Sequence, residues 1–180
     1  MAQPRPGDFC CIPVSGPVGF GISLGQWLDG DRWSDYRHTE IYVGRADADG
    51  PFGYTVSTYP SGPGKRALPC APAKLPGSLW SSGLIDLTGV QRVGITEWAL
   101  AHQDVRYSFL DYAALTLHGL GISDPALQRY IAATSHMICA QYVDKGYAVN
   151  GVKLFTDERW NGYVKPGDLA QLLQSRIQVV

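Results

Sequence analysis

The sequence predicts an α+β protein, with strands in the first half of the chain and helices in the second, folded as one domain over residues 1–180. Short apolar segments separated by proline and glycine fill the first half. From Thr88 onward, apolar residues recur at the spacing of a helix. The composition, 45% hydrophobic and 17% charged, is typical of a globular domain that buries a core.

The expected strands are short and end at proline or glycine. Within residues 38–44, HTEIYVG, Ile41 and Val43 share one face, which indicates a half-buried strand. The opposite face carries His38, Glu40 and Tyr42. Further strands are expected at residues 7–16, 53–62, 65–71 and 79–87. Residues 18–30 have helical spacing, and the Pro/Gly-rich segment 60–77 is interpreted as a loop.

The second half is expected to hold helices and one last strand. The apolar positions of its first helix are Val90, Val93, Trp98 and Ala101. Further helices are expected at residues 108–121, 125–133, 138–149 and 166–175, followed by an edge strand at 176–180. Asp8 and Asp168 each follow Pro-Gly, and both are expected to cap or close turns.

Charge and cysteine spacing exclude several classes of function. The net charge is −1 and the basic residues are scattered, so neither nucleic acid nor an anionic membrane is an expected partner. The sequence contains no run of about 18 apolar residues, so it predicts no membrane span. Its first residues do not resemble a secretory signal. The spacing of the cysteines fits neither zinc nor disulfides, which predicts free thiols in a reducing compartment. They are Cys10, Cys11, Cys70 and Cys139.

Cys139 opens the expected helix 138–149, and it has two interpretations. Its face of the helix also carries Tyr142, Val143, Gly146 and Tyr147, which indicates packing in a core. The opposite face carries Gln141, Asp144 and Lys145. A position in the first turn, with Thr134 and Ser135 as candidate caps, also favours a thiolate, because the helix dipole and unpaired amides lie there.

A nucleophilic thiol needs a base, and the chain offers four histidines. His102 ends a helix, where we expect it to cap carbonyl groups. His118 falls in an apolar helix, and His136 lies at or before the start of the Cys139 helix. His38 opens a strand, either as a solvated residue or as the base. Periodicity alone does not choose among the four.

Seven short motifs extend along nearly the whole chain. They are, in order, PGDFCCIP, FGISLGQWL, HTEIYVG, TVSTYPSG, VRYSFLDYAAL, ICAQYV and PGDLAQL. In order and spacing they resemble the circularly permuted branch of the NlpC/P60 papain-like superfamily, in which the histidine strand precedes the cysteine helix. The resemblance implies a permuted papain-like fold, with an antiparallel sheet or half-barrel packed against helices.

The resemblance also implies roles for single residues. Cys139 matches the nucleophile, His38 matches the base, and Tyr107 matches a tyrosine that lines the site. The third polar position, often glutamate in the family, falls on Ser57. A glycine of the family motif is replaced by Glu40, whose carboxylate either substitutes as the partner of His38 or crowds the cleft.

The implied activity is that of a thiol hydrolase, a cysteine peptidase or amidase that cleaves amide bonds through a thioester without metal or organic cofactor. The expected substrate is the stem peptide of bacterial cell-wall peptidoglycan. Two alternatives stay open: a structural virion subunit of a phage tail, with tail proteins as partners and weak or lost activity, and a lipid acyltransferase or thioesterase. Lacking a secretory signal, the protein is expected in the cytoplasm of the producing cell or within a phage virion.

Overall fold

The structure is a computed structural model, and the part of the chain that it describes holds five strands and three helices. The residues described are 3–13, 35–44, 52–59, 62–69, 77–107, 125, 129, 137–157 and 163–177. Their elements are β1 (Phe9–Ile12), β2 (His38–Gly44), β3 (Phe52–Tyr59), β4 (Gly62–Pro69), β5 (Leu79–Trp80), α2 (Gly89–Ala101), α5 (Cys139–Ala148) and α6 (Pro166–Ile177). This order confirms an α+β protein with strands first and helices second.

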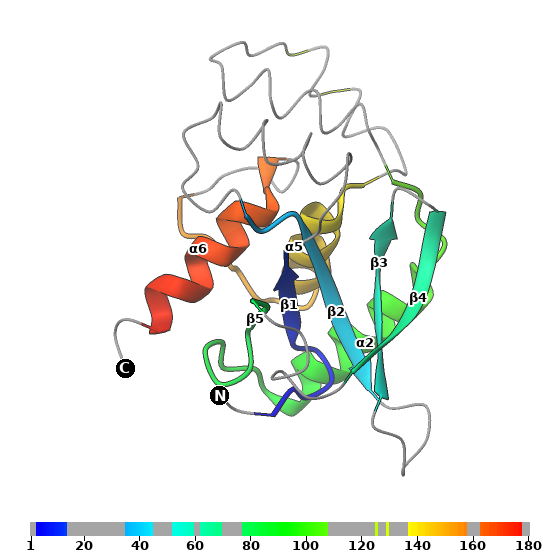
Figure 1. Ribbon diagram of the computed structural model, residues 1–180, viewed down its shortest axis with the longest axis horizontal. Helices are drawn as coiled ribbons and strands as arrows, with labels where there is room; N and C mark the ends of the chain where they lie inside the picture. The colour runs from blue at the N-terminus through cyan, green and yellow to red at the C-terminus, as the bar shows by residue number, and fades with distance from the viewer. Residues whose placement is uncertain are drawn as a thin grey trace.

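The five strands form one antiparallel sheet in the order β4-β3-β2-β1-β5 (Figure 1). β1 pairs with β2 so that Ile12 lies opposite His38 and Cys10 lies opposite Glu40. β2 pairs with β3 so that Tyr42 lies opposite Thr55. The register therefore sets which polar side chains meet on each face of β2.

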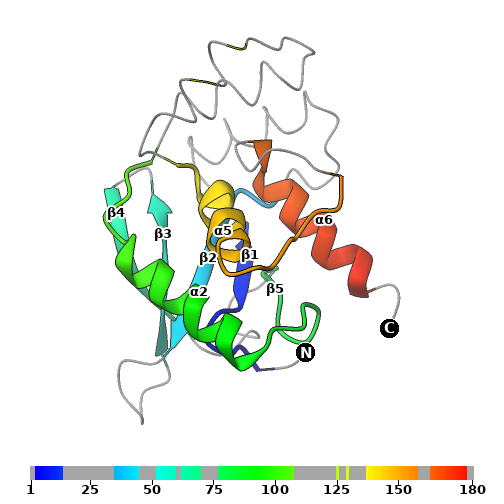
Figure 2. The same ribbon diagram turned by 180° about the vertical axis from the view of Figure 1, so that it is seen from behind.

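Helices α2 and α5 pack on one face of the sheet, and α6 contacts β1, β5 and α5 (Figure 2). Ile41 of β2 and Val56 of β3 are fully buried in this core, together with Val143 and Tyr147 of α5. The opposite side of the sheet has its own buried cluster, formed by Cys10, Ile12, Tyr42 and Trp80.

β2 is buried on both faces rather than on one. The alternation is as expected, since Ile41 lies in the helix-covered core and Tyr42 lies in the second cluster. The half-buried prediction is wrong, because His38 is only 6% exposed and Glu40 is fully buried. The interpretation of His38 as a solvated strand residue is excluded for the same reason.

Helix α5 confirms the expected helix at 138–149, but more of its circumference is buried than predicted. Lys145 is exposed as expected, whereas Gln141 and Asp144 are buried. Ile138 occupies the N-cap position, and its backbone N–H donates to Oε1 of Gln141 at 2.9 Å. Residues 134 and 135, the expected caps, lie outside the described part of the chain.

Helix α2 begins where the sequence predicts, but the residues that it buries in the core are not the predicted ones. Thr88 caps its N-terminus, because its hydroxyl accepts from the Gln91 N–H at 3.2 Å. The buried residues are Ile95 and Ala99. The expected apolar stripe is wrong at three of its four positions, since Val90 is 84% exposed, Val93 is 58% exposed and Ala101 is also exposed.

Other expected elements are confirmed only in part. Residues 79–87 contain a strand of two residues, and residues 176 and 177 end α6 instead of starting an edge strand. The expected helices at 18–30 and 108–121 lie outside the described residues, as does most of 125–133.

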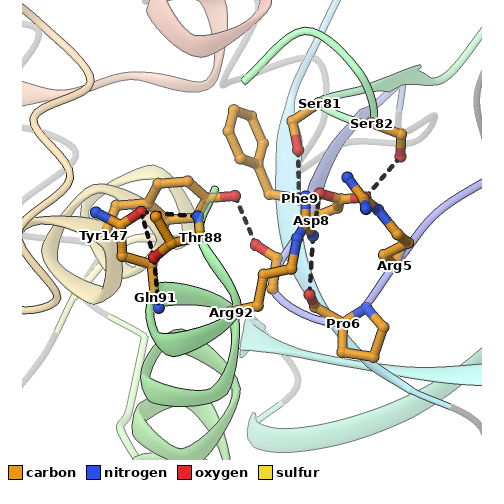
Figure 3. A network of polar contacts seen from close by, with 11 residues as sticks. Arg5, Pro6, Asp8, Phe9, Ser81, Ser82, Thr88, Gln91, Arg92 and Tyr147 are labelled. Atoms are coloured by element: carbon orange, nitrogen blue, oxygen red, sulfur yellow. Dashed lines mark hydrogen bonds and ion pairs between the residues drawn. The ribbon is translucent and has the colours of Figure 1, made fainter. Parts of the chain in front are cut away.

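A buried polar network joins the start of β1 to helices α2 and α5 (Figure 3). Asp8, which is fully buried, forms an ion pair with Arg92 at 2.8 Å and accepts from the Ser82 hydroxyl at 2.9 Å. Asp8 also accepts from the Arg5 N–H at 2.8 Å, which confirms its predicted role in a turn. At the end of α5, the Tyr147 hydroxyl donates to the Gly7 carbonyl at 2.6 Å. These contacts fix α5 against the sheet.

Candidate functional site

The direction of α5 brings Cys139 to the end of β2 that carries His38. Tyr147, near the C-terminal end of α5, bonds to Gly7, and the Gly7 N–H donates to the Tyr42 carbonyl near the far end of β2. The first turn of α5 therefore lies at the opposite end of β2, where His38 is the first residue.

The Cys139 thiol and the His38 imidazole shift each other's pKa. Burial alone lowers the pKa of His38, but the charge of the Cys139 thiolate and hydrogen bonds with Cys139 and Glu40 outweigh it and raise this pKa from 6.5 to about 9. Burial alone raises the pKa of Cys139, but the imidazolium charge of His38 and a hydrogen bond to it lower this pKa overall. Both shifts favour a thiolate–imidazolium ion pair.

Thr39 adds to the stabilisation of the thiolate. Its backbone N–H acts to lower the pKa of Cys139. The residue is fully buried on β2, opposite Cys11 of β1. Sequence reasoning did not single out Thr39, because a residue between two motif positions gives no signal until the helix is placed over the strand.

The pKa values of two neighbouring thiols, Cys11 and Cys139, are shifted in opposite directions. Burial raises the pKa of Cys11 well above its usual value, and the negative charge of Cys139 raises it further. Cys11 belongs to the apolar core of the molecule. Cys139 is only 1% exposed but is not among the described members of either apolar cluster. The core-packing interpretation of Cys139 therefore accounts for its burial but not for its polar neighbours.

The carboxylate of Glu40 faces the imidazole of His38. Its Oε1 lies 3.2 Å from Nε2 of His38, and its Oε2 accepts a hydrogen bond of 2.6 Å from the Thr55 hydroxyl. Glu40 is fully buried, so its charge acts on the ring with little screening by solvent. Glu40 thus contacts the imidazole, as its role as the partner of His38 requires. Thr55 was not anticipated, because its contact depends on the register of β2 and β3.

Ser57 is bound to the backbone of β2. Its hydroxyl donates to the Thr39 carbonyl at 2.7 Å, and the residue is 1% exposed. The hydroxyl proton is therefore used on a main-chain oxygen, and the contact joins β3 to β2 beside the site. The carboxylate that contacts His38 comes from Glu40, two residues along the same strand.

A backbone contact places Tyr107 beside the start of helix α5. It forms a parallel bridge with Met137, whose N–H donates to the Arg106 carbonyl at 3.1 Å. Met137 is two residues before Cys139, and Tyr107 is partly buried. The backbone of this segment thus lies next to the start of α5, and the role of the Tyr107 side chain stays a prediction.

One of the remaining histidines is described, and its role is structural. Nδ1 of His102 donates to the Trp98 carbonyl at 2.8 Å at the end of α2, and its ring stacks on Trp98. This confirms the predicted cap. His118 and His136 lie outside the described residues.

Cys139 is almost completely buried. Only 1% of the surface of this residue is exposed. A substrate therefore reaches the sulfur only if neighbouring groups move. Across the described ranges, no three histidine, cysteine or acidic residues are grouped so as to hold a metal ion.

Comparison with known proteins gave no relatives: no protein-family model matches the chain, and no match was found among curated proteins. Over the described ranges, no helix is both long and apolar enough to cross a membrane.

Proposed function

We propose that the protein is a thiol hydrolase in which Cys139 is the nucleophile, His38 is the general acid and base, and Glu40 orients the imidazole. The observation that supports this proposal best is the mutual pKa shift of Cys139 and His38, since each raises the charged population of the other. Perturbed titratable pairs of this kind are typical of catalytic sites.

The reaction begins with attack of the Cys139 thiolate on the carbonyl carbon of an amide. The oxyanion is held by the Cys139 N–H at the start of α5 and by a second donor. Ile138 at the N-cap is aliphatic and offers no side-chain acceptor to the amides of the first turn. Collapse of the adduct breaks the C–N bond, and the imidazolium of His38 protonates the leaving amine.

The thioester is then hydrolysed. Neutral His38 removes a proton from water, and the resulting hydroxide attacks the thioester carbon. Cleavage of the C–S bond releases a carboxylic acid and restores the thiolate beside the imidazolium. Glu40 stabilises the imidazolium in the states where it is present and prevents the ring from rotating.

For the substrate, we propose a peptide or amide bond of bacterial cell-wall peptidoglycan, as the motif resemblance implies. Incubation with muropeptides, followed by mass spectrometry, tests this assignment. We expect cleaved stem peptide with the native protein and none with Cys139→Ser.

The nucleophile is tested separately from the substrate. Iodoacetamide is applied across a range of pH, and the alkylated cysteine is located by mass spectrometry. We expect Cys139 to react well below about pH 8 and to lose that reactivity in His38→Ala. Cys11 serves as the internal control, because its raised pKa keeps it protonated. Equal reactivity of Cys139 and Cys11 refutes the catalytic role.

One observation favours a second candidate, a structural phage-tail subunit of the same fold. The 1% exposure of Cys139 is what a site that no longer turns over would show. This candidate predicts that Cys139 labels no faster than Cys11 and that muropeptides stay intact. The two tests above therefore separate the candidates.

A further inference from the structure

Thr55 lies beside the Glu40 carboxylate, on the side away from the imidazole. Its hydroxyl donates to Oε2 over 2.6 Å, while Oε1 lies 3.2 Å from Nε2 of His38. A bond of that length is typical of a hydroxyl paired with an ionised carboxylate. The two oxygens of Glu40 thus have separate partners, and together these partners fix the plane of the carboxylate.

The strand register explains why Thr55 reaches Glu40 and not another group. Tyr42 and Thr55 are direct cross-strand partners, so Thr55 is the diagonal neighbour of Glu40 on the same face of the sheet. Both residues are fully buried, where a flexible acidic side chain without a donor is costly.

We propose that Thr55 is a positioning residue of the site: by holding Oε2 of Glu40, it keeps the carboxylate ionised and aimed at His38. This inference rests on the proposed function, because it assigns Thr55 a part in preparing the Cys139–His38 pair. Thr55 acts through Glu40 and touches no reacting atom. A hydroxyl that donates to a carboxylate favours its ionised form, which in turn favours the imidazolium form of His38.

The test is a pH titration of the His38 ring by nuclear magnetic resonance in the full-length protein. Thr55→Val keeps the shape of the side chain and removes the hydroxyl. We expect it to lower the pKa of His38 by about 0.3 to 0.5 unit, which is part of what Glu40 contributes and a roughly two- to threefold increase in the acid dissociation constant. Thr55→Ser keeps the hydroxyl, and we expect it to leave the titration unchanged.

Thr58 supplies a matched control on the same strand. It is fully buried, and its hydroxyl makes no hydrogen bond in the structure. Thr58 lies three residues from Thr55 and therefore on the opposite face. Thr58→Val tests the effect of removing a buried hydroxyl from β3 in general, and we expect no shift of the His38 titration.

A double mutant shows whether Thr55 acts through Glu40. In a Glu40→Gln background, Thr55→Val should produce no further shift, since the charge it positions is gone. A similar shift in both backgrounds, or an equal shift in Thr58→Val, overturns the inference. If Thr55→Val does not fold, Thr55→Ala is compared with Thr55→Ser, and identical titrations of these two overturn it as well.

Failure of the proposed function is distinguishable from failure of this inference. An ordinary His38 pKa in the native protein contradicts the ion pair itself. A raised His38 pKa that Thr55→Val leaves unchanged contradicts only the role of Thr55.

Discussion

Replacing Glu40 with glutamine removes one buried negative charge while keeping the size of the side chain. The His38 pKa is about 9 instead of 6.5, and Cys139 contributes more to this rise than Glu40 does. We therefore assign Glu40 less than half of the rise, about one pKa unit. The expected pKa of His38 in Glu40→Gln is accordingly about 8.

The direction of this shift follows from the chemistry of the pair. A carboxylate near an imidazolium opposes loss of its proton, so removing the carboxylate lowers the pKa at which His38 becomes neutral. The assay is a titration of the His38 ring by nuclear magnetic resonance, with denaturant unfolding as a check of the fold. A His38 pKa equal to or above that of the native protein would falsify the assignment of Glu40 as the orienting carboxylate.

Three further predictions concern stability, each measured by urea unfolding. Arg92→Ala leaves Asp8 as an uncompensated buried charge and should lower the free energy of unfolding by about 3–5 kcal/mol; a loss under about 1 kcal/mol contradicts this. Gly146→Ala places a Cβ 2.8 Å from Cε3 of Trp98 and should cost about 1–3 kcal/mol; no loss means that the ring yields freely. In the ion pair, the raised pKa of His38 and the lowered pKa of Cys139 offset each other, because between about pH 6.5 and 9 the folded pair and the unfolded residues bind the same number of protons. The advantage of the native protein over His38→Gln should therefore stay level across this range; an advantage that shrinks there by on the order of 3 kcal/mol would mean that His38 is protonated beside a neutral thiol.

The local elements were predictable because their signals are local. The alternation of HTEIYVG correctly placed Ile41 and Tyr42 on opposite faces of β2. The same alternation put Glu40 on the face of His38, two residues along the strand, and this is the contact observed. Burial was less predictable: Gln141 and Asp144 are polar, yet they are buried in α5. The period of a helix identifies its most apolar face and not how many neighbours surround it.

The pairing of Cys139 with His38 was not predictable from spacing. About a hundred residues separate them, and four histidines were equal candidates until the motif resemblance favoured one. The contact of Thr55 with Glu40 was not predictable for another reason. It depends on the register between β2 and β3, which the pattern of a single sequence does not determine. Apolar spacing also misplaced the buried face of α2, because Val90 and Val93 fit a helical period but face solvent.

The proposed mechanism requires a charged sulfur at Cys139, and the ultraviolet absorbance of the thiolate measures this charge directly without requiring a reagent to enter the site. The titration is run on the native protein, Cys139→Ser and His38→Ala. We predict that the native protein shows a thiolate signal at a pH where an ordinary thiol is still protonated, because His38 lowers the pKa of Cys139. This signal should be absent in Cys139→Ser and displaced to alkaline pH in His38→Ala. Identical titrations of the native protein and Cys139→Ser up to about pH 8 would contradict the ion pair and the hydrolase proposed from it.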